Sequence, residues 1–373
     1  MTLAAISVEL GPPLDCEEEE WLLALADMEN WTAPEFSRNQ ADRAGDVLRG
    51  TVTPGDEALW VYRVINNWRQ SHDFPLARIR LDLRRHARRV QKTALVVGRI
   101  KRLQSVREKL RTNDTMDLTQ IQDIGGCRAV MKSMAEVNRL LEIYKERNDF
   151  EHMFRWQSPY IDNPKPTGYR SHHLIYQFQN TPGGTDVFNK HRVEMQIRTR
   201  LQHAWATAVE TVGMFTGHAL KANVGDQDWL RLFALMSSEF AEMEGTAVVP
   251  GTPERRSDRV YEIRHLAKQL RAVQTLDAYS HAVYELGHFE KHARYFLLQY
   301  DYKANKIYAE GFFRGEIKTA NAWYEEAEKE ATARNRNVVL VSADSLDQLR
   351  SAYPNYFLDA GKFTNHLWRV IQK

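Results

Sequence analysis

Apolar side chains recur every three or four residues through the first third of the chain, the spacing of a helix with one buried face. In one segment the repeat is carried by Leu83, Ala87 and Val90. Ser37 is followed by Gln40 at capping-box spacing, which indicates where a helix begins. We therefore expect helices over 17–30, 41–48, 56–70, 79–97 and 99–111.

Further along the chain, short runs of alternating apolar and polar residues replace the helical repeat. They predict strands over 128–131, near 160, over 173–178 and over 187–198. Helical patterns over 135–147 and 201–212 separate these strands. Strands that alternate with helices predict an α/β core, in which helices flank a mixed β-sheet.

Residues 245–258 (GTAVVPGTPERRSD) have the Gly, Pro and Thr content of a linker. We expect residues 1–244 to form the N-terminal helices and the core, and residues 259–373 to form a small α+β C-terminal domain. Within that domain the pattern predicts a helical stretch over 259–300, a hairpin over 300–313, a helix over 319–334, a strand over 338–342 and a terminal helix.

The composition is that of a soluble globular protein, with 43% hydrophobic and 27% charged residues. Two cysteines, Cys16 and Cys127, are too few for a disulfide framework and favour a reducing compartment. No signal-peptide pattern and no apolar run long enough to span a bilayer is visible. We therefore expect a cytoplasmic protein.

The first candidate site is a group of cations, Arg99, Lys101 and Lys109, with Ser105 among them. Lys101 and Lys109 are eight residues apart, about 80° around a helix, so both can face one cleft. Converging cations of this kind suit a triphosphate, whose charge they neutralise and orient. A solvated basic face is the alternative.

The second candidate is Asp123, followed by a glycine pair and Arg128. An aspartate at this place could hold Mg²⁺, which prefers one or two carboxylates together with phosphate oxygens. The alternative is an aspartate that caps a glycine turn.

The third candidate is a Pro- and Gly-containing loop with Lys165, Tyr169, Ser171 and His173. Such a loop can stack a flat base on Tyr169 while Lys165 and His173 contact phosphate. An ordinary structural loop with a half-buried tyrosine is the alternative.

The fourth candidate is the alternating segment 193–199, which directs Glu194, Gln196 and Arg198 to one face of a strand. This face would carry an acid, an amide and a base, as a catalytic floor does. On an edge strand the same alternation is simply the wet face. On the following helix, Trp205 is expected in the core beside a hydrogen-bonded His203.

Five motifs occur in one order over about residues 95–215: RIKRLQSVREKL, DIGGCRAV, PKPTGYRSHH, VEMQIRT and HAWA. This set resembles the synthetase domain of the RelA/SpoT-homologue family, the (p)ppGpp synthetases and their small single-domain relatives. The resemblance implies a nucleotidyltransferase-like core and a Mg²⁺-dependent transfer of the β,γ-diphosphate of ATP to a ribose hydroxyl.

The resemblance also implies roles for individual residues. Asp123 and Glu194 match the metal-associated carboxylates, and Glu194 also matches the group that helps to deprotonate the attacking hydroxyl. Tyr169 matches the aromatic residue that stacks the acceptor base, with His173 and Gln196 beside it. The residues expected to bind ATP are Arg99, Lys101, Lys109, Lys165 and Arg198.

The family's hydrolase needs a histidine upstream of a His-Asp pair, and no histidine precedes His72-Asp73 in this sequence. We therefore expect no hydrolase activity. A synthetase without a hydrolase must be restrained in another way.

The acceptor stays open between the 3′ end of tRNA and a guanosine or adenosine nucleotide, which would make (p)ppGpp or (p)ppApp. Arginines crowd the stretch 78–92 and favour a polynucleotide partner. The alternatives are a solvated basic face and an allosteric phosphate site. The residues predicted to contact tRNA are Arg84, Arg85, Arg88 and Arg89.

The layout resembles the fused toxin–antitoxin subgroup of these enzymes, called CapRel. That resemblance implies a toxin that inhibits translation, a C-terminal domain that blocks the site, and release by a phage capsid protein during antiviral defence. In the tail it rests on Tyr353 and Tyr356, which lie one helical turn apart and could plug a base-stacking pocket. A structural aromatic pair is the alternative.

Overall fold

The computed structural model describes residues 31–50, 56–180, 186–216, 227–279, 283–286, 293–301, 306–331, 336–343 and 360–372. The predicted helix over 17–30, Cys16, Tyr353 and Tyr356 lie outside the described residues. No helix within the described ranges is long and apolar enough to cross a membrane.

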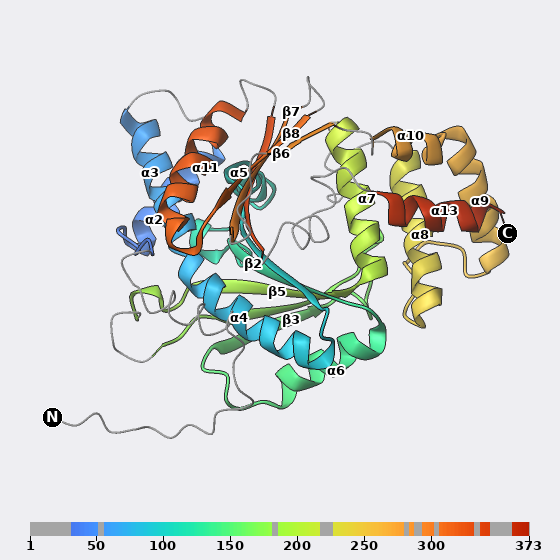
Figure 1. The fold of residues 1–373 in the computed structure, drawn as a ribbon, viewed down its shortest axis with the longest axis horizontal. Helices are drawn as coiled ribbons and strands as arrows, with labels where there is room; N and C mark the ends of the chain where they lie inside the picture. Colours follow the sequence, from blue (N-terminus) through green and yellow to red (C-terminus); the bar gives the residue numbers. More distant parts are fainter. Residues whose placement is uncertain are drawn as a thin grey trace.

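One mixed sheet of nine strands runs through the molecule in the order β3-β4-β5-β2-β1-β9-β7-β8-β6 (Figure 1). The pairs β2–β5 and β6–β8 are parallel, and the other neighbours are antiparallel. The predicted mixed sheet with flanking helices is confirmed. The strands are β1 (Leu95–Ile100), β2 (Gly125–Met131), β3 (Met153–Pro159), β4 (His172–Gln177), β5 (Arg192–Thr199), β6 (Val283–Leu286), β7 (Tyr295–Asp301), β8 (Lys306–Phe312) and β9 (Arg336–Ser342).

Helices pack on one face of this sheet, and a separate group of helices lies at one end of the molecule (Figure 1). Two helices begin at capping boxes, α2 at Ser37 and α6 at Ser133. The helices are α2 (Arg38–Arg49), α3 (Asp56–Gln70), α4 (Asp73–Val90), α5 (Leu103–Thr112), α6 (Met134–Glu146), α7 (Arg200–Thr216), α8 (Gln227–Glu244), α9 (Arg256–Gln269), α10 (Ala272–Tyr279), α11 (Ile317–Ala331) and α13 (Gly361–Gln372).

The prediction of one helix over 79–97 and another over 99–111 is wrong in its boundaries. Helix α4 ends at Val90, β1 occupies the next apolar run, and α5 starts only at Leu103. The valines Val96 and Val97 are buried on opposite faces of the sheet, a position that suits β-branched side chains. Arg99 therefore lies on a strand and not at the start of a helix.

One face of the sheet packs against α4 and α6. Buried side chains from β2, β4 and β5 meet Leu83 of α4 and Leu140 of α6 in a single hydrophobic cluster. Burying several aliphatic side chains here contributes about 1.5–3 kcal/mol for each one. The opposite face carries the polar residues described below.

The C-terminal strands extend the core sheet. Gly98 and Arg99 of β1 pair with Ser342 and Val341 of β9. β7 and β8 form a hairpin over 295–312, which begins earlier than the hairpin predicted over 300–313. The helical stretch predicted over 259–300 is wrong beyond α10, because strands occupy 283–286 and 295–301. The division at 245–258 remains a prediction, but the sheet itself is continuous across it.

Helices α7, α8, α9, α10 and α13 form a bundle around a second hydrophobic cluster, which includes Trp205, Phe233, Ile263 and Phe363 (Figure 1). The core position expected for Trp205 is confirmed, and its indole Nε1 donates to the carbonyl oxygen of Phe233 at 2.7 Å. The last helix of the chain thus packs beside helices of the predicted core.

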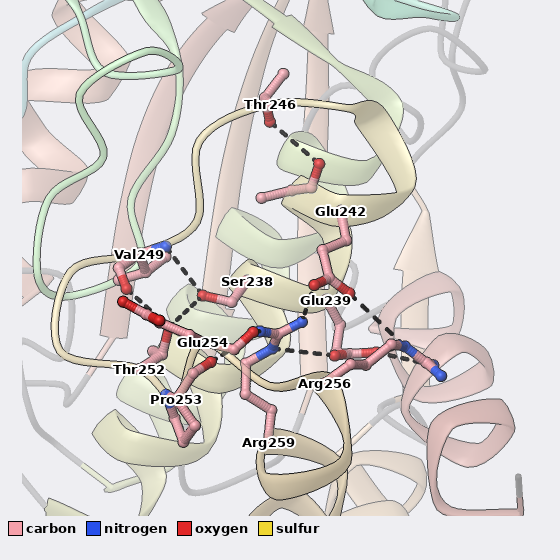
Figure 2. Close-up of polar contacts among 11 residues, drawn as sticks. Ser238, Glu239, Glu242, Thr246, Val249, Thr252, Pro253, Glu254, Arg256 and Arg259 are labelled. Atoms are coloured by element: carbon pink, nitrogen blue, oxygen red, sulfur yellow. Dashed lines mark hydrogen bonds and ion pairs between the residues drawn. The ribbon is translucent and has the colours of Figure 1, made fainter.

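The segment between α8 and α9 is folded closely onto α8 (Figure 2). The hydroxyl of Ser238 lies 2.8 Å from that of Thr252 and accepts from the backbone N–H of Val249 at 2.9 Å. The guanidinium of Arg259 is fully buried and donates to Glu239 at 3.2 Å and to the carbonyl oxygen of Pro253 at 2.8 Å. These bonds make the segment a fixed connection.

Helix α11 rests on α3 through a buried ion pair. Arg69 of α3 donates to both carboxylate oxygens of Glu328, at 2.9 and 3.2 Å, and its guanidinium lies over the ring of Tyr324. Glu328 also accepts from the backbone N–H of Leu103 at 2.8 Å, and Arg69 donates to the carbonyl oxygen of Lys101 at 2.9 Å. The contact therefore reaches the start of α5.

We predict that Glu239→Ala lowers the free energy of unfolding by about 3–5 kcal/mol, because it leaves the buried Arg259 without its buried carboxylate partner. The matched control is Glu262→Ala, which removes another α8–α9 pair, that with Arg231, at about one-third exposure. Glu262→Ala should lower the free energy of unfolding by less than about 1 kcal/mol. Urea denaturation measures both; equal losses would contradict the prediction.

Candidate functional site

The polar face of the sheet is built by the register of four strands. Arg99 of β1 pairs with Gly126 of β2, which in turn pairs with Glu194 of β5. In the next row Gln196 of β5 pairs with both its neighbours, Arg128 of β2 and His173 of β4. Charged and polar side chains from strands far apart in sequence are thereby placed on one surface.

The alternation predicted for β5 is confirmed. Val193, Met195 and Ile197 are buried in the helix-covered cluster, whereas Glu194 and Gln196 lie on the other face. β5 is an internal strand between β4 and β2, so the interpretation as the wet face of an edge strand is wrong. β5 therefore has a hydrogen-bonded strand on each side, and its polar side chains form the floor of the candidate site.

Arg198 lies on the same face as Glu194 but is buried, with 2% of its surface exposed. Its guanidinium contacts Nδ1 of His203 on α7 at 2.5 Å. Burial lowers the pKa of Arg198 to about 9, and the positive charge of Arg128 acts in the same direction. His203 is hydrogen-bonded as expected, and it supports Arg198.

Asp123 brings the two predicted lysines together. Nζ of Lys101 lies 2.7 Å from its Oδ2, and Nζ of Lys109 lies 2.8 Å from its Oδ1. Burial alone raises the pKa of Asp123, but the two ammonium groups outweigh burial and hold this pKa well below its ordinary value. The convergence of the two lysines is confirmed, although Lys101 precedes the helix on which Lys109 lies.

A chain of hydrogen bonds crosses the floor from the loop to the sheet. The hydroxyl of Tyr169 lies 2.8 Å from Nε2 of His173, whose Nδ1 lies 2.9 Å from Oε1 of Glu194. Gln196 donates to Oε2 of Glu194 at 2.6 Å, and Arg128 donates to Gln196 at 3.4 Å. The structure therefore joins the candidates of the third and fourth motifs in one network.

The network keeps Glu194 ionised and Tyr169 neutral. Burial alone raises the pKa of Glu194, but His173 beside it and the amide of Gln196 lower this pKa below the ordinary value. The charge of Asp123 opposes this and is close enough to act on Glu194. Burial raises the pKa of Tyr169 to about 12. Glu194 can accept a proton at neutral pH, and the hydroxyl of Tyr169 stays a donor.

The loop over 164–170 is shaped by Gly168, whose φ is +94°. A Cβ at this position would lie 2.9 Å from the ring of Trp205 and 3.1 Å from Cα of Ala234, so no larger residue fits. Its carbonyl oxygen accepts from the hydroxyl of Ser237 on α8 at 2.6 Å. The tyrosine that follows is therefore held on both α7 and α8.

An aromatic cluster lies around Lys165 and Tyr169 of this loop. The ring of Tyr160 lies 6.0 Å from that of Tyr169 and 5.2 Å from that of His173, both edge to face. Nζ of Lys165 is 4.4 Å from the centroid of Tyr160 and 5.7 Å from that of Tyr169. A cation beside flat rings is an arrangement that suits a nucleotide.

Two further residues, Arg170 and Glu244, were not singled out from the sequence. Arg170, next to Tyr169, is buried and donates to Glu244 at the end of α8 at 2.8 Å. Arg170 belongs to the PKPTGYRSHH motif, but its partner lies 74 positions away. No local pattern in the sequence connects the two.

The residues present fit a magnesium ion held partly by its substrate. The described residues contain no group of three or more His, Cys, Asp and Glu side chains arranged to hold a metal. Mg²⁺ needs only one or two carboxylates when phosphate oxygens complete its shell. Asp123 and Glu194 are carboxylates of this floor that lie close enough for the charge of one to act on the other.

Most of the basic stretch 78–92 lies in α4. Arg84 is buried, with 2% of its surface exposed, so it cannot belong to a solvent-facing surface as predicted. Arg85 and Arg88 are partly exposed and Arg89 is exposed. A contact with nucleic acid remains a prediction for these three.

The His72-Asp73 pair is part of the packing of α3, α4 and α11. His72 Nδ1 lies 2.7 Å from the carbonyl oxygen of Trp68, and Asn321 of α11 donates to Asp73 at 2.8 Å. Burial raises the pKa of Asp73 to about 7, although the hydrogen bond from Asn321 opposes the shift. Both side chains have structural partners here.

Comparison with known proteins finds similarity in the part of the chain that carries these motifs. Residues 98–213 match the model described as the region found in RelA / SpoT proteins. The chain is 31% identical over 141 residues to GTP pyrophosphokinase YjbM of Bacillus subtilis (strain 168), which is 37% of this chain and 62% of the relative. It is 29% identical over 115 residues to GTP pyrophosphokinase YwaC of the same organism, 30% of this chain and 53% of the relative.

The chain thus spans between half and two thirds of the length of these curated relatives. Among solved structures, a GTP pyrophosphokinase family protein from Streptococcus pneumoniae matches with 22% identity and a TM-score of 0.38, over 48% of this chain and 91% of that one. Small alarmone synthetase 1 from Bacillus subtilis bound to pppGpp matches with 21% identity and a TM-score of 0.38, over 50% of this chain and 97% of that one. Residues 98–213 of the chain are thus similar to the region found in RelA / SpoT proteins and to part of two GTP pyrophosphokinases.

Proposed function

We propose that the chain is an ATP-dependent pyrophosphokinase, a diphosphotransferase without hydrolase activity. The observation that carries the proposal is the polar face of the sheet, where Glu194 lies in a hydrogen-bonded row and Asp123 holds two lysines. The family region covers this face, and the curated relatives are named GTP pyrophosphokinases.

In the proposed reaction an acceptor hydroxyl attacks the β-phosphorus of ATP. The new O–P bond forms as the bond from the β-phosphorus to the α,β-bridging oxygen breaks, and AMP leaves. The hydroxyl proton passes to Glu194, which its neighbours keep ionised. The protein mainly positions the reactants and stabilises charge, as is usual in phosphoryl transfer.

Lys101 and Lys109 are suited to an exchange of partners. Both ammonium groups lie on Asp123, at 2.7 and 2.8 Å. The phosphates of ATP, assisted by Arg99 and Lys165, would draw the lysines away and leave the carboxylate oxygens of Asp123 for Mg²⁺. Arg198 is buried against His203 and would act on the phosphates through its charge. When bound, Mg²⁺ would neutralise charge that develops on the transferred diphosphate.

Tyr169 is proposed to stack the acceptor base, with His173 and Gln196 beside it. Its ring stands among Tyr160, His173 and Trp205, and its hydroxyl is fixed by His173. Stacking on an aromatic side chain contributes about 1–3 kcal/mol per base.

For the acceptor we propose the 3′-hydroxyl at the 3′ end of tRNA, a modification that would inhibit translation. The exposed arginines near the end of α4 favour a polynucleotide. The names of the curated relatives favour a second candidate, a (p)ppGpp or (p)ppApp alarmone synthetase that uses GDP, GTP or an adenosine nucleotide.

We also propose that residues 259–373 restrain the core and that a phage protein, in the first place a capsid protein, releases it in an abortive, toxin–antitoxin type of defence. The contact that supports this is the Arg69–Glu328 pair, which joins α11 to the backbone of Lys101. A ligand shifts such an equilibrium only through its differential affinity for the two states. Tyr353 and Tyr356 remain proposed members of the restraint.

The carboxylates test the reaction. We expect Glu194→Gln to reduce diphosphate transfer by about 10²–10⁴-fold, because the variant has no proton acceptor at this position. We expect Asp123→Asn to abolish transfer. Radiolabelled ATP and thin-layer chromatography measure transfer, while thermal melting shows that the fold is kept. Asp114→Asn, on an exposed turn beyond α5, is the matched control. Activity within ten-fold of wild type in both site variants would remove the assignment.

The acceptor is tested by charge reversal on α4. If tRNA is the substrate, Arg85→Glu with Arg88→Glu should weaken tRNA labelling and reduce its log–log salt slope by roughly 0.7–0.9 for each phosphate that the variant no longer neutralises. The matched control is Arg139→Glu with Lys145→Glu, which are exposed on α6. Labelling of GDP or GTP without labelling of tRNA would establish the alarmone reaction in place of the tRNA reaction.

The restraint is tested at the α11 contact. We expect Glu328→Ala to raise transfer by the full-length chain about 5- to 150-fold, the usual range of a coupling between sites. Glu326→Ala, whose carboxylate is exposed beside Lys329, should leave transfer unchanged. Purified phage capsid protein should activate wild type but add little to the Glu328 variant. A fall in activity with Glu328→Ala would mean that α11 supports the core.

A further inference from the structure

The end of α8 contacts the loop over 164–170 at two points. Ser237 donates to the carbonyl oxygen of Gly168, and Glu244 receives the guanidinium of Arg170 at 2.8 Å. These two loop residues flank Tyr169, so the backbone on both sides of the proposed stacking residue is tied to one helix. The loop's position is therefore set by α8.

Glu244 connects three elements in a buried setting. Its carboxylate accepts from Arg170 of the loop, from the hydroxyl of Thr199 at the end of β5, and from Gln202 at the start of α7 at 3.0 Å. The side chains of Arg170 and Glu244 are 1% and 6% exposed. Arg170 also donates to the hydroxyl of Thr246 at 2.7 Å.

A buried pair of this kind is better at fixing geometry than at adding stability, because desolvation offsets most of its attraction. Here the fixed geometry is that of the site. Arg170 follows Tyr169 directly, and Thr199 follows Arg198. One carboxylate thus sets both the loop and the end of the floor strand.

The end of α8 is itself anchored from the other side (Figure 2). Arg259 of α9 contacts both Glu239 and Glu242, and Arg256 donates to Glu239 at 3.0 Å. The figure shows these side chains on the same stretch of α8 that leads to Thr246. Glu244 is therefore presented from a helix end that is held rigidly.

We propose that Glu244 is a positioning residue for the acceptor, which through Arg170 holds Tyr169 and His173 in line with Glu194. It touches no substrate and acts only through the loop. The inference rests on the proposed pyrophosphokinase function. It assigns to the Arg170–Glu244 pair a larger effect on the acceptor than on the donor, because Lys101, Lys109 and Asp123 have no contact with the pair among the described interactions. Of the residues expected to meet ATP, only Lys165 and Arg198 lie on the loop and the strand that the pair fixes.

The test is Glu244→Gln in the full-length chain, which keeps the size of the side chain and removes its charge. We expect kcat/KM for the acceptor to fall between about 10- and 100-fold, as small misplacements in active sites do, with KM for ATP within two-fold of wild type. Tyr169→Ala should likewise lower kcat/KM for the acceptor and leave KM for ATP within two-fold of wild type. Glu262→Gln, at the partly exposed α8–α9 pair, is the matched control.

If Glu244→Gln does not fold, Thr246→Val is the second variant, because it removes one hydrogen bond to Arg170 with little change of shape. It should lower kcat/KM for the acceptor by a smaller factor and leave KM for ATP unchanged. A parallel loss of thermal stability and of kcat/KM for both substrates would show a merely structural role and overturn the inference. An unchanged kcat/KM for the acceptor in a Glu244→Gln variant with normal thermal stability would also overturn it. Absence of transfer by wild type to GDP, GTP and tRNA alike would instead overturn the proposed function.

Discussion

The hydrogen bonding along both edges of β1 is the interaction on which the rest of the structure depends. On one edge the strand pairs with β2 and so aligns Arg99 with Gly126 and Glu194. On the other edge it pairs with β9. A Cβ at Gly98 would lie 3.0 Å from Cδ of Arg80 and 3.2 Å from the hydroxyl of Ser342. The close approach of the C-terminal strands therefore favours glycine at this position.

Buried ion pairs occur where segments distant in sequence meet. Arg69 meets Glu328 where α11 rests on α3, and Arg170 meets Glu244 where the 164–170 loop rests on α8. An apolar contact would hold such segments at least as strongly, but it would tolerate small shifts that an ion pair with directed hydrogen bonds does not. The site needs fixed positions more than it needs added stability.

Features that depend on neighbours in sequence could be predicted well. The capping box at Ser37 and the alternation around Glu194 follow from local chemistry, and the structure contains them. The strand over 95–100 could not be separated from the preceding helix, because a short apolar run fits a buried strand as well as a helix. The burial of Arg84 depends on how α4 packs, which its spacing alone does not determine.

The contacts that organise the site from outside were beyond local patterns altogether. Arg170 and Glu244 are 74 positions apart, and Arg69 and Glu328 are 259 apart. Each glutamate stands on a helix that carries other glutamates, and only the tertiary fold selects the one that meets the arginine. The convergence of Lys101 and Lys109 was predicted, although the helix geometry used to bring them together was wrong for Lys101, and their meeting on Asp123 was not foreseen.

The C-terminal half of the chain reaches the proposed site by two separate routes. At one end, α11 contacts Arg69, which binds the backbone of Lys101 beside the lysines that would meet ATP. At the other end, α9 anchors the part of α8 from which Glu244 holds the loop of Tyr169. A movement of α11 would therefore act first on the donor, and a movement of α9 first on the acceptor. Because the two routes share no residue, a partner that displaced only one of them would change the use of one substrate before the other. If residues 259–373 restrain the core as proposed, the restraint could be released in steps, which a single plug in the site would not allow.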